Sequence, residues 1–170
     1  MANSYAEGML ILPPDKMDQK INRMVYQLLE ENFEENELIL VGIDGPGYEL
    51  ASILSGKLKE FSDKKLHLTK LLIDKNDPLS GNITLENEIA TEGKTIVLID
   101  DVINTGGTMF YALKPFTEQY IKKLQTLALV FRSHNSFPLM PDFYGMSLAT
   151  TLQQHIHVEF DKKNKGLYLY

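Results

Sequence analysis

Two adjacent carboxylates followed by a loop of small residues form the part of this sequence best suited to chemistry. An apolar run, 95–99, leads directly into Asp100 and Asp101, and the chain then continues as Asn104, Thr105, Gly106, Gly107 and Thr108. Glycine permits a tight turn and lets an anion approach the backbone, while threonine hydroxyls donate hydrogen bonds. A helix that begins here would add unpaired N–H groups and the positive end of its dipole. The loop is therefore predicted to hold a phosphate group.

The two acids indicate what else the ligand carries. Asp100 and Asp101 follow a predicted strand, at the edge of an open α/β sheet where ligands bind. Two carboxylates would repel a ligand that offered phosphate alone, but they suit sugar hydroxyls or a Mg²⁺ ion. A phosphorylated ribose satisfies both halves of the segment. An Asp-Asp pair or a Thr-Gly-Gly-Thr run alone is usually a turn, so this interpretation depends on their combination after a buried strand.

The elements that must position this segment alternate along the chain. Continuous apolar runs predict strands buried on both faces, at 38–43, 66–73, 95–99 and 124–131. Helical spacing predicts a helix with Asp15 as its N-cap, a second over 48–61, and a third from 108 to about 120 that Pro115 kinks or ends early. Shorter strands are expected around Ile83, at 156–160 and at 166–170. The alternation predicts an α/β fold with a mostly parallel sheet.

Composition excludes several other classes of protein. The 170 residues suit one domain, and no apolar run approaches the ~18 residues of a membrane helix. The absence of cysteine removes disulfides, thiolate metal sites and cysteine nucleophiles, and with no secretory signal a cytoplasmic location is expected. A net charge of −6 disfavours broad binding to RNA or to anionic membranes.

The segment 95–109 resembles the phosphoribosyl-pyrophosphate motif of type I phosphoribosyltransferases, which is an apolar strand, paired acids and Thr-Gly-x-Thr. The run 40–43 with the glycine-bearing loop after it resembles that family's pyrophosphate loop. The polar stretch 74–94 takes the place of its flexible catalytic loop, and 129–134 with 141–145 resembles its base-binding hood. Order and spacing, including Ala149-Thr150-Thr151, are closest to the pyrimidine operon regulator/uracil phosphoribosyltransferase subgroup.

The resemblance implies a fold and a reaction. The fold is a single domain, 1–170, with a mostly parallel twisted sheet flanked by helices, a flexible loop, and a small hood formed by the N-terminal segment and about 132–170. The reaction transfers ribose 5-phosphate from phosphoribosyl pyrophosphate to a nitrogenous base, requires Mg²⁺ and releases pyrophosphate. Its oxocarbenium-like transition state makes catalysis mostly a matter of positioning and charge stabilisation. Relatives in the subgroup commonly self-associate, so a homo-oligomer is expected.

The resemblance also assigns roles to residues. The 5-phosphate would be held by Asn104, Thr105, Gly106, Gly107 and Thr108. The ribose hydroxyls would meet Asp100 and Asp101, directly or through water bound to Mg²⁺. Pyrophosphate would be lined by Asp44, Gly45, Pro46 and Gly47, with Lys70 or Lys75 as a cation for the leaving group and Lys75 assigned to catalysis. The base would meet Arg132, Phe143 and Tyr144.

Several positions depart from the family pattern. Pro46 stands where the subgroup has a basic residue, and it also lacks an N–H donor. Gly107 occupies a place where relatives often carry Arg or Lys. Relatives that use purines have an acid, a general base, where this chain has Asn104, which cannot accept a proton usefully at neutral pH. That argues against a purine and leaves a pyrimidine such as uracil.

Other functions remain open from the sequence alone. Loss of basic residues from two anion loops favours an impaired enzyme that senses phosphoribosyl pyrophosphate or nucleotide. An RNA-binding regulator of pyrimidine genes needs a clustered cationic face, yet the chain has only two arginines, Arg23 and Arg132. A purine phosphoribosyltransferase is a further alternative. Dinucleotide binding at 45–47 fails because Leu50 replaces the third glycine that such a motif requires.

Overall fold

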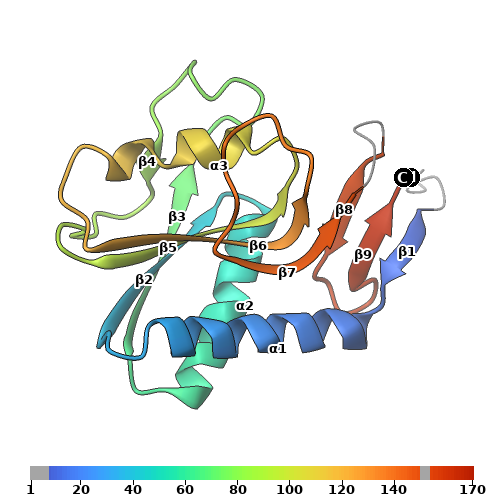
Figure 1. Ribbon diagram of the computed structural model, residues 1–170, viewed down its shortest axis with the longest axis horizontal. Helices are drawn as coiled ribbons and strands as arrows, with labels where there is room; N and C mark the ends of the chain where they lie inside the picture. The colour runs from blue at the N-terminus through green and yellow to red at the C-terminus, as the bar shows by residue number, and fades with distance from the viewer. Residues whose placement is uncertain (1–7, 150–153) are drawn as a thin grey trace.

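The computed structural model describes residues 8–149 and 154–170, and these residues form two sheets flanked by helices (Figure 1). The main sheet contains β2 (Glu37–Ile43), β3 (Lys65–Leu72), β4 (Thr84–Leu85), β5 (Thr95–Ile103), β6 (Lys123–Arg132) and β7 (Phe143–Leu148). A smaller antiparallel sheet contains β1 (Met9–Leu12), β8 (Ile156–Glu159) and β9 (Gly166–Leu169). The helices are α1 (Pro14–Glu31), α2 (Pro46–Phe61) and the short α3 (Gly107–Ala112), which a 3₁₀ turn, Lys114–Phe116, follows.

Strand order in the main sheet locates its ligand crevice. The order is β4-β3-β2-β5-β6-β7, and all neighbouring pairs are parallel except β3 with β4. The chain runs outward from β2 through α2 to β3, and outward in the opposite direction from β5 through α3 to β6. The order therefore reverses between β2 and β5. In open α/β sheets the crevice beyond the carboxyl ends of two such strands is where ligands bind.

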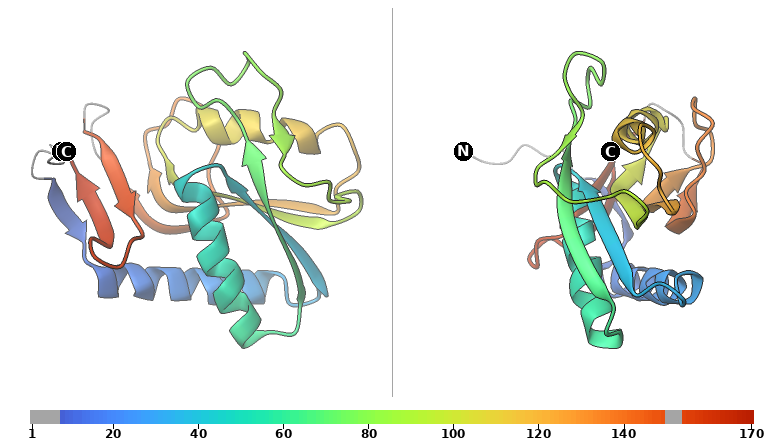
Figure 2. Two further views of the ribbon diagram at one scale, coloured as in Figure 1. Left: turned by 180° about the vertical axis from the view of Figure 1, so that it is seen from behind. Right: turned by 90° about the vertical axis from the view of Figure 1, so that its left-hand side faces the viewer.

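The core lies on both faces of this sheet. On one face α1 and α2 pack against alternate strand residues such as Leu40, Val97 and Leu127. The other face carries α3 and packs through intervening residues such as Val41 and Leu98. Figure 2 shows α1 and α2 on one side of the twisted sheet and α3 on the other. Burial on both faces explains why these strands are continuous apolar runs rather than alternating ones.

Most predicted elements are present, with three corrections. Strand β5 continues to Ile103, so Asp100 and Asp101 are strand residues rather than loop residues. The helix after the loop ends at Ala112, and a 3₁₀ turn that contains Pro115 follows, so the early stop expected at this proline is present. Helix α1 has Pro13 as its N-cap, and Asp15 lies in its first turn.

The third correction concerns the segment that was expected to belong to the hood. Residues 143–148 form β7, a parallel strand of the main sheet beside β6. Gly145 and Ser147 interrupt the apolar pattern of this strand, which is why its periodicity is weak in the sequence. The other two parts of the predicted hood, the N-terminal strand β1 and the C-terminal pair β8 and β9, do meet in the smaller sheet.

Two further observations bear on the expectations from sequence. The short strand expected near Ile83 is present as β4, which pairs with the end of β3. Across 8–149 and 154–170, the structure holds no helix with the length and apolar character needed to cross a bilayer.

Candidate functional site

The carboxylate of Asp100 is buried at the carboxyl end of β5, beside the reversal in strand order. Asp100 is only 4% exposed. The backbone N–H of Asp101 donates to Asp100 Oδ1 at 3.0 Å, and Lys75 Nζ lies 3.4 Å from the same oxygen. Lys75 reaches this oxygen from the polar loop that follows β3. The tertiary structure thus brings together two of the residues that the sequence assigned to catalysis.

Burial changes the acidity of Asp100. Removal from water, reinforced by the negative charge of Asp101, raises the pKa of Asp100 to about 8, although the Lys75 ammonium opposes this rise. The carboxyl group is therefore largely protonated near neutral pH until a further cation or a set of donors reaches it. A perturbed acid in a crevice of the sheet is a recognised sign of a functional site.

The loop after β5 has the backbone shape expected of an anion cradle. Gly106 has φ = +85°, a left-handed conformation that favours glycine, and α3 starts immediately after it. Thr105 Oγ1 accepts a hydrogen bond from the N–H of Gly107 at 3.2 Å, which orients the hydroxyl within the loop. A small pocket opens here, lined by Asp100, Val102, Ile103, Asn104, Thr105, Gly106, Thr108 and Met109. The buried acid and the loop thus share one pocket, as their spacing predicted.

A second segment, the connection between β6 and β7, supports this loop. The backbone N–H groups of Ser136 and Phe137 both donate to Thr105 O, at 2.9 and 3.1 Å. The Phe137 ring packs against α3, with its centroid 5.3 Å from that of Phe110. A Cβ placed on Gly107 would lie 3.0 Å from the Phe137 ring. The aromatic ring therefore closes one side of the loop, a role that nothing in the local sequence marks.

The predicted pyrophosphate loop lies at the same edge of the sheet. Gly45 has φ = 94° and ψ = −140°, a region that side chains rarely adopt, so the turn into α2 needs a glycine here. The N–H of Gly45 donates to Asp44 Oδ1 at 3.0 Å, and Pro46 begins α2. Lys70 Nζ lies 3.5 Å from the same Asp44 oxygen. Gly47 packs directly against Asp100, so the loop from Asp44 to Gly47 adjoins the paired acids.

The long polar segment after β3 stands beyond this edge. Figures 1 and 2 show it as the green loop that rises from β3 and β4 above the sheet, next to α3. Its start is organised by Asp74, whose Oδ1 accepts from the N–H groups of Asn76 and Asp77 at 2.9 and 3.3 Å. Apart from β4, the described structure of 74–94 has no strand or helix. The segment is thus a long connection over the site, as its polarity and length indicated.

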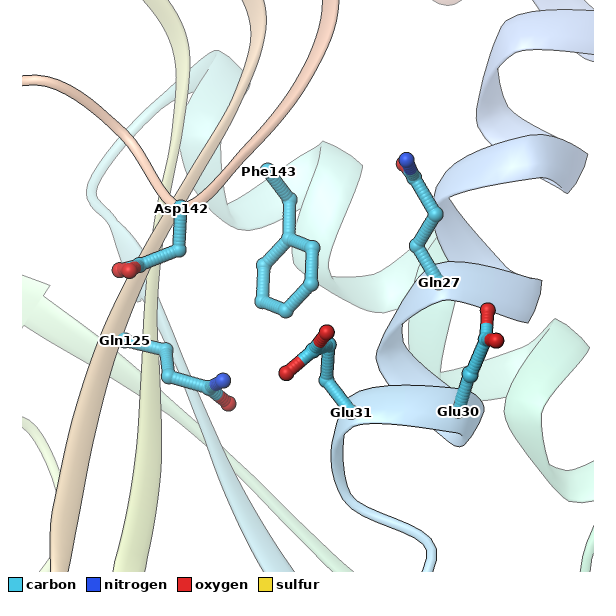
Figure 3. A pocket seen from close by; sticks show the side chains of 6 residues that line it. All are labelled: Gln27, Glu30, Glu31, Gln125, Asp142 and Phe143. Carbon is cyan, nitrogen blue, oxygen red and sulfur yellow. The ribbon is translucent and has the colours of Figure 1, made fainter.

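The three predicted base contacts are not together. Phe143, only 4% exposed, packs in the core at the amino-terminal end of β7. Figure 3 shows its ring beside Glu31, Gln125 and Asp142, at a polar pocket next to α1. Phe143 pairs with Leu127, which pairs with Ile99, so it lies level with the residue before Asp100 but two strands away. Its ring is buried on the face that α1 covers, and its contact with a base stays a prediction.

The other two predicted base contacts, Tyr144 and Arg132, lie on β7 and β6. Tyr144 is half-buried, and its ring packs near that of Phe131 with centroids 5.9 Å apart. Arg132 ends β6 at the carboxyl edge, where its guanidinium donates to Gln154 O and where burial lowers its pKa. Tyr144 pairs with Ala128, which pairs with Asp100, so Tyr144 lies level with this acid two strands away, whereas Arg132 lies further along, at the end of β6.

The residues at this edge fit a Mg²⁺ ion. Carboxylate oxygens are the ligands that Mg²⁺ prefers, and the ammonium of Lys75 already lies against Asp100 as a cation would. No group of three or more His, Asp or Glu residues suited to a metal occurs within 8–149 and 154–170. The two acids would therefore supply part of a coordination shell, and oxygens of a bound ligand would supply more.

Comparison with known proteins gives a consistent picture. The family model for the phosphoribosyl transferase domain matches residues 11–164. The bifunctional protein PyrR of Haemophilus ducreyi is 31% identical over 159 residues, which cover 88% of each chain. The protein of the same name from Geobacter sp. strain M21 is 31% identical over 168 residues, which cover 94% of this chain and 95% of the other.

Solved structures share the fold at low sequence identity. The hypoxanthine phosphoribosyltransferase of Trypanosoma cruzi superposes with a TM-score of 0.78 at 12% identity, covering 96% of each chain. A hypoxanthine-guanine phosphoribosyltransferase from Bacillus anthracis gives a TM-score of 0.68 at 14% identity, covering 84% of this chain and 83% of the other. These two likenesses concern the architecture.

Proposed function

This chain belongs to the phosphoribosyl transferase domain family, a family of glycosyltransferase-type enzymes, and from that premise we propose that it transfers ribose 5-phosphate from phosphoribosyl pyrophosphate to a pyrimidine base such as uracil. Pyrophosphate is the second product. The observation that carries the proposal is the pocket in which buried Asp100 adjoins the loop from Asn104 to Thr108. A phosphorylated sugar is the ligand class that matches carboxylates and an anion cradle at once.

Each end of the donor has a counterpart in this proposal. Thr105, Gly106, Gly107 and Thr108, with Asn104, would bind the 5-phosphate through backbone N–H groups and hydroxyls. Asp100 and Asp101 would accept hydrogen bonds from the ribose hydroxyls. Asp44, Gly45, Pro46 and Gly47 would border the pyrophosphate, which places the bond to be broken between the two loops.

Charge development explains why acids belong beside the sugar. The glycosidic carbon gains positive charge as pyrophosphate departs, and carboxylates near the ribose stabilise that charge. Binding of donor and cation would lower the pKa of Asp100 from its raised value, because it would supply partners for the charged form. Closure of the 74–94 loop would keep water away from the reacting carbon and so prevent hydrolysis of the donor.

Mg²⁺ fits beside the two acids and, when bound, would neutralise pyrophosphate charge as the leaving group departs. We place Asp100 and Asp101 near it, directly or through water, because they are the paired carboxylates of the pocket. Lys75, whose ammonium is 3.4 Å from Asp100 Oδ1, would hold the acid in position and link loop closure to the site.

The choice of a pyrimidine depends on the residue before the phosphate loop. Relatives that use purines carry an acid at this place as the base for the ring nitrogen's proton, and Asn104 is a poor base. Uracil must also lose the proton of its reacting nitrogen, which the departing pyrophosphate can accept, and polar groups can hold its ring; Arg132 ends β6 at the same edge of the sheet.

The test is an assay with a panel of bases. Purified protein is incubated with Mg²⁺, phosphoribosyl pyrophosphate and each of uracil, orotate, hypoxanthine, guanine and adenine, and the nucleotide and pyrophosphate are quantified. We expect one nucleotide, uridine monophosphate, with equimolar pyrophosphate. Turnover with a purine and none with uracil would overturn the substrate assignment. Absence of donor binding by calorimetry would overturn the function itself.

A second candidate is a sensor that binds the donor without turning it over. The observation in its favour is the pyrophosphate loop, where an acid, Asp44, and a proline, Pro46, replace cationic and N–H donor groups. Donor binding with no product from any base would support it. An RNA mobility-shift titration with salt tests whether such a sensor also regulates through RNA, and binding confined to very low salt would count against that role.

Two expectations about the whole protein accompany this proposal. Self-association is expected, and sedimentation velocity of the full chain would test it. A cytoplasmic location is also expected, and fractionation of cells that produce the chain would test it.

A further inference from the structure

Lys70 stands at the mouth of the pyrophosphate loop although no loop residue there is basic. It lies near the carboxyl end of β3, in register with Gly42 of β2, whose strand leads into that loop. Its Nζ is 3.5 Å from Asp44 Oδ1, 3.7 Å from Glu86 Oε1 and 4.9 Å from the centroid of the Tyr48 ring. Two separate segments and the start of α2 therefore surround one ammonium group.

The contacts hold this ammonium loosely. Charge-assisted N–H···O bonds are usually about 2.7–2.9 Å long, so separations of 3.5 and 3.7 Å are ion pairs rather than tight hydrogen bonds. The Lys70 side chain is 24% exposed, whereas those of Asp44 and Glu86 are about half exposed, at 53% and 47%. The cation is thus the less exposed partner, and its counter-ions can turn away into water.

Asp44 makes the two contacts that a pyrophosphate oxygen would need. One carboxylate oxygen, Oδ1, accepts the N–H of Gly45 at 3.0 Å and also lies nearest to Lys70 Nζ. An N–H group of a glycine turn together with an ammonium group is an anion site. The protein's own carboxylate occupies it in this conformation.

We propose that Lys70 is the cation of the pyrophosphate subsite and that Asp44 is an internal counter-anion which pyrophosphate must displace. This inference rests on the proposed function and deepens it, because it names the group that receives the leaving group. Lys70 thereby supplies from β3 the positive charge that the loop lacks at Pro46. Lys75 keeps its separate place on Asp100.

The first arm of the test removes the cation. Binding of inorganic pyrophosphate with Mg²⁺ is measured by calorimetry for the wild type and for Lys70→Met, and binding of ribose 5-phosphate is measured in parallel. We expect Lys70→Met to weaken pyrophosphate about tenfold or more, as for loss of a contact to a charged group, and to leave ribose 5-phosphate within about twofold. Unchanged pyrophosphate affinity would overturn the proposal.

A matched control corrects for net charge. Lys94→Met removes the same charge from a lysine whose Nζ is 2.7 Å from Glu37 Oε2, at the amino end of β5 and away from the site. We expect it to leave pyrophosphate affinity unchanged. An equal loss in both variants would show a general effect of charge and would also overturn the proposal.

The second arm releases the internal anion. Asp44→Asn keeps an oxygen for the N–H of Gly45 but removes the charge that holds Lys70, whereas Asp44→Ala frees both. We expect pyrophosphate to bind a few-fold more tightly to Asp44→Asn and more tightly still to Asp44→Ala. Weaker binding in either variant would show that Asp44 is itself a ligand for the Mg²⁺-pyrophosphate complex, and would overturn its role as a competitor.

The two levels of the proposal can fail separately. If the wild type binds neither phosphoribosyl pyrophosphate nor pyrophosphate, the proposed function fails. If the wild type binds both and the variants at positions 44 and 70 behave like it, only the assignment of Lys70 and Asp44 fails.

Discussion

Gly47, at the start of α2, lies directly against Asp100, at the end of β5. A Cβ atom on Gly47 would stand 2.7 Å from Asp100 Oδ1 and 3.0 Å from both Asp100 Cα and Ile99 O. The two loops proposed to bracket the bond being broken therefore touch through a backbone with no side chain. The contact fixes the distance between the pyrophosphate loop and the acids, and it contributes to the burial that raises the pKa of Asp100.

We predict that Gly47→Ala separates these loops. The new methyl group meets backbone atoms that cannot turn aside, so we expect a loss of stability of about 1–3 kcal/mol and weaker donor binding. The matched control is Gly56→Ala in the same helix, where a Cβ meets nothing within 4 Å and should raise stability by roughly 0.5–1 kcal/mol. Urea denaturation and calorimetry with the donor measure both effects. Normal donor affinity in folded Gly47→Ala would contradict the prediction.

A second prediction concerns the two acids. The double variant Asp100→Asn, Asp101→Asn should lose binding of phosphoribosyl pyrophosphate, because neutral amides cannot attract the cation and accept ribose hydroxyls as carboxylates do. The control Glu30→Gln, Glu31→Gln also removes two neighbouring negative charges, but at the polar pocket beside α1, whose lining includes neither Asp100 nor the loop after β5. We expect calorimetry to show wild-type affinity for the control. Unchanged binding by the first variant would refute the role of the acids.

The raised pKa of Asp100 predicts how stability depends on pH. Below about pH 4 the group is protonated in both the folded and the unfolded chain, so it has no net effect. Between pH 4 and about 8 the unfolded chain releases this proton while the folded chain keeps it, so this group makes stability fall as pH rises. Asp100→Asn cannot titrate, so it removes this loss of stability. We expect its melting temperature to match the wild type near pH 4 and to exceed it at pH 8, where each 1 kcal/mol is about 2–4 °C.

The reverse outcome has a clear meaning. If Asp100→Asn lowers the melting temperature at pH 8, the charged carboxylate is well compensated in the free protein, and the ion pair with Lys75 dominates over burial.

A fourth prediction separates the fold from function at the phosphate loop. Gly106 and Gly93 both have positive φ, +85° and +68°, so alanine at either position should cost about 1–2 kcal/mol. Only Gly106→Ala alters the anion cradle, since Gly93 precedes β5 at the other end of the strand. We expect ribose 5-phosphate to bind at least fivefold more weakly to Gly106→Ala and normally to Gly93→Ala. Equal affinities would place the phosphate elsewhere.

The sequence by itself determined the α/β class and the location of the acids and of the predicted phosphate loop. These features are local, because apolar runs, paired acids and a Thr-Gly-Gly-Thr turn are encoded by neighbouring residues. It also indicated the stop at Pro115 and the long polar connection after β3. Local pattern and environment separate at Phe143, whose ring has the chemistry to stack on a base yet packs in the core.

Only the tertiary structure decided which distant residues meet. Lys75 reaches Asp100, Lys70 reaches Asp44, and Phe137 covers the phosphate loop across many intervening residues. Parallel strands place their carboxyl ends at one edge of the sheet. Strand register, side-chain length and burial then decide which side chains at that edge come into contact. The pKa of Asp100 has the same origin, because it depends on the water that neighbouring segments exclude rather than on the residues beside it in the chain.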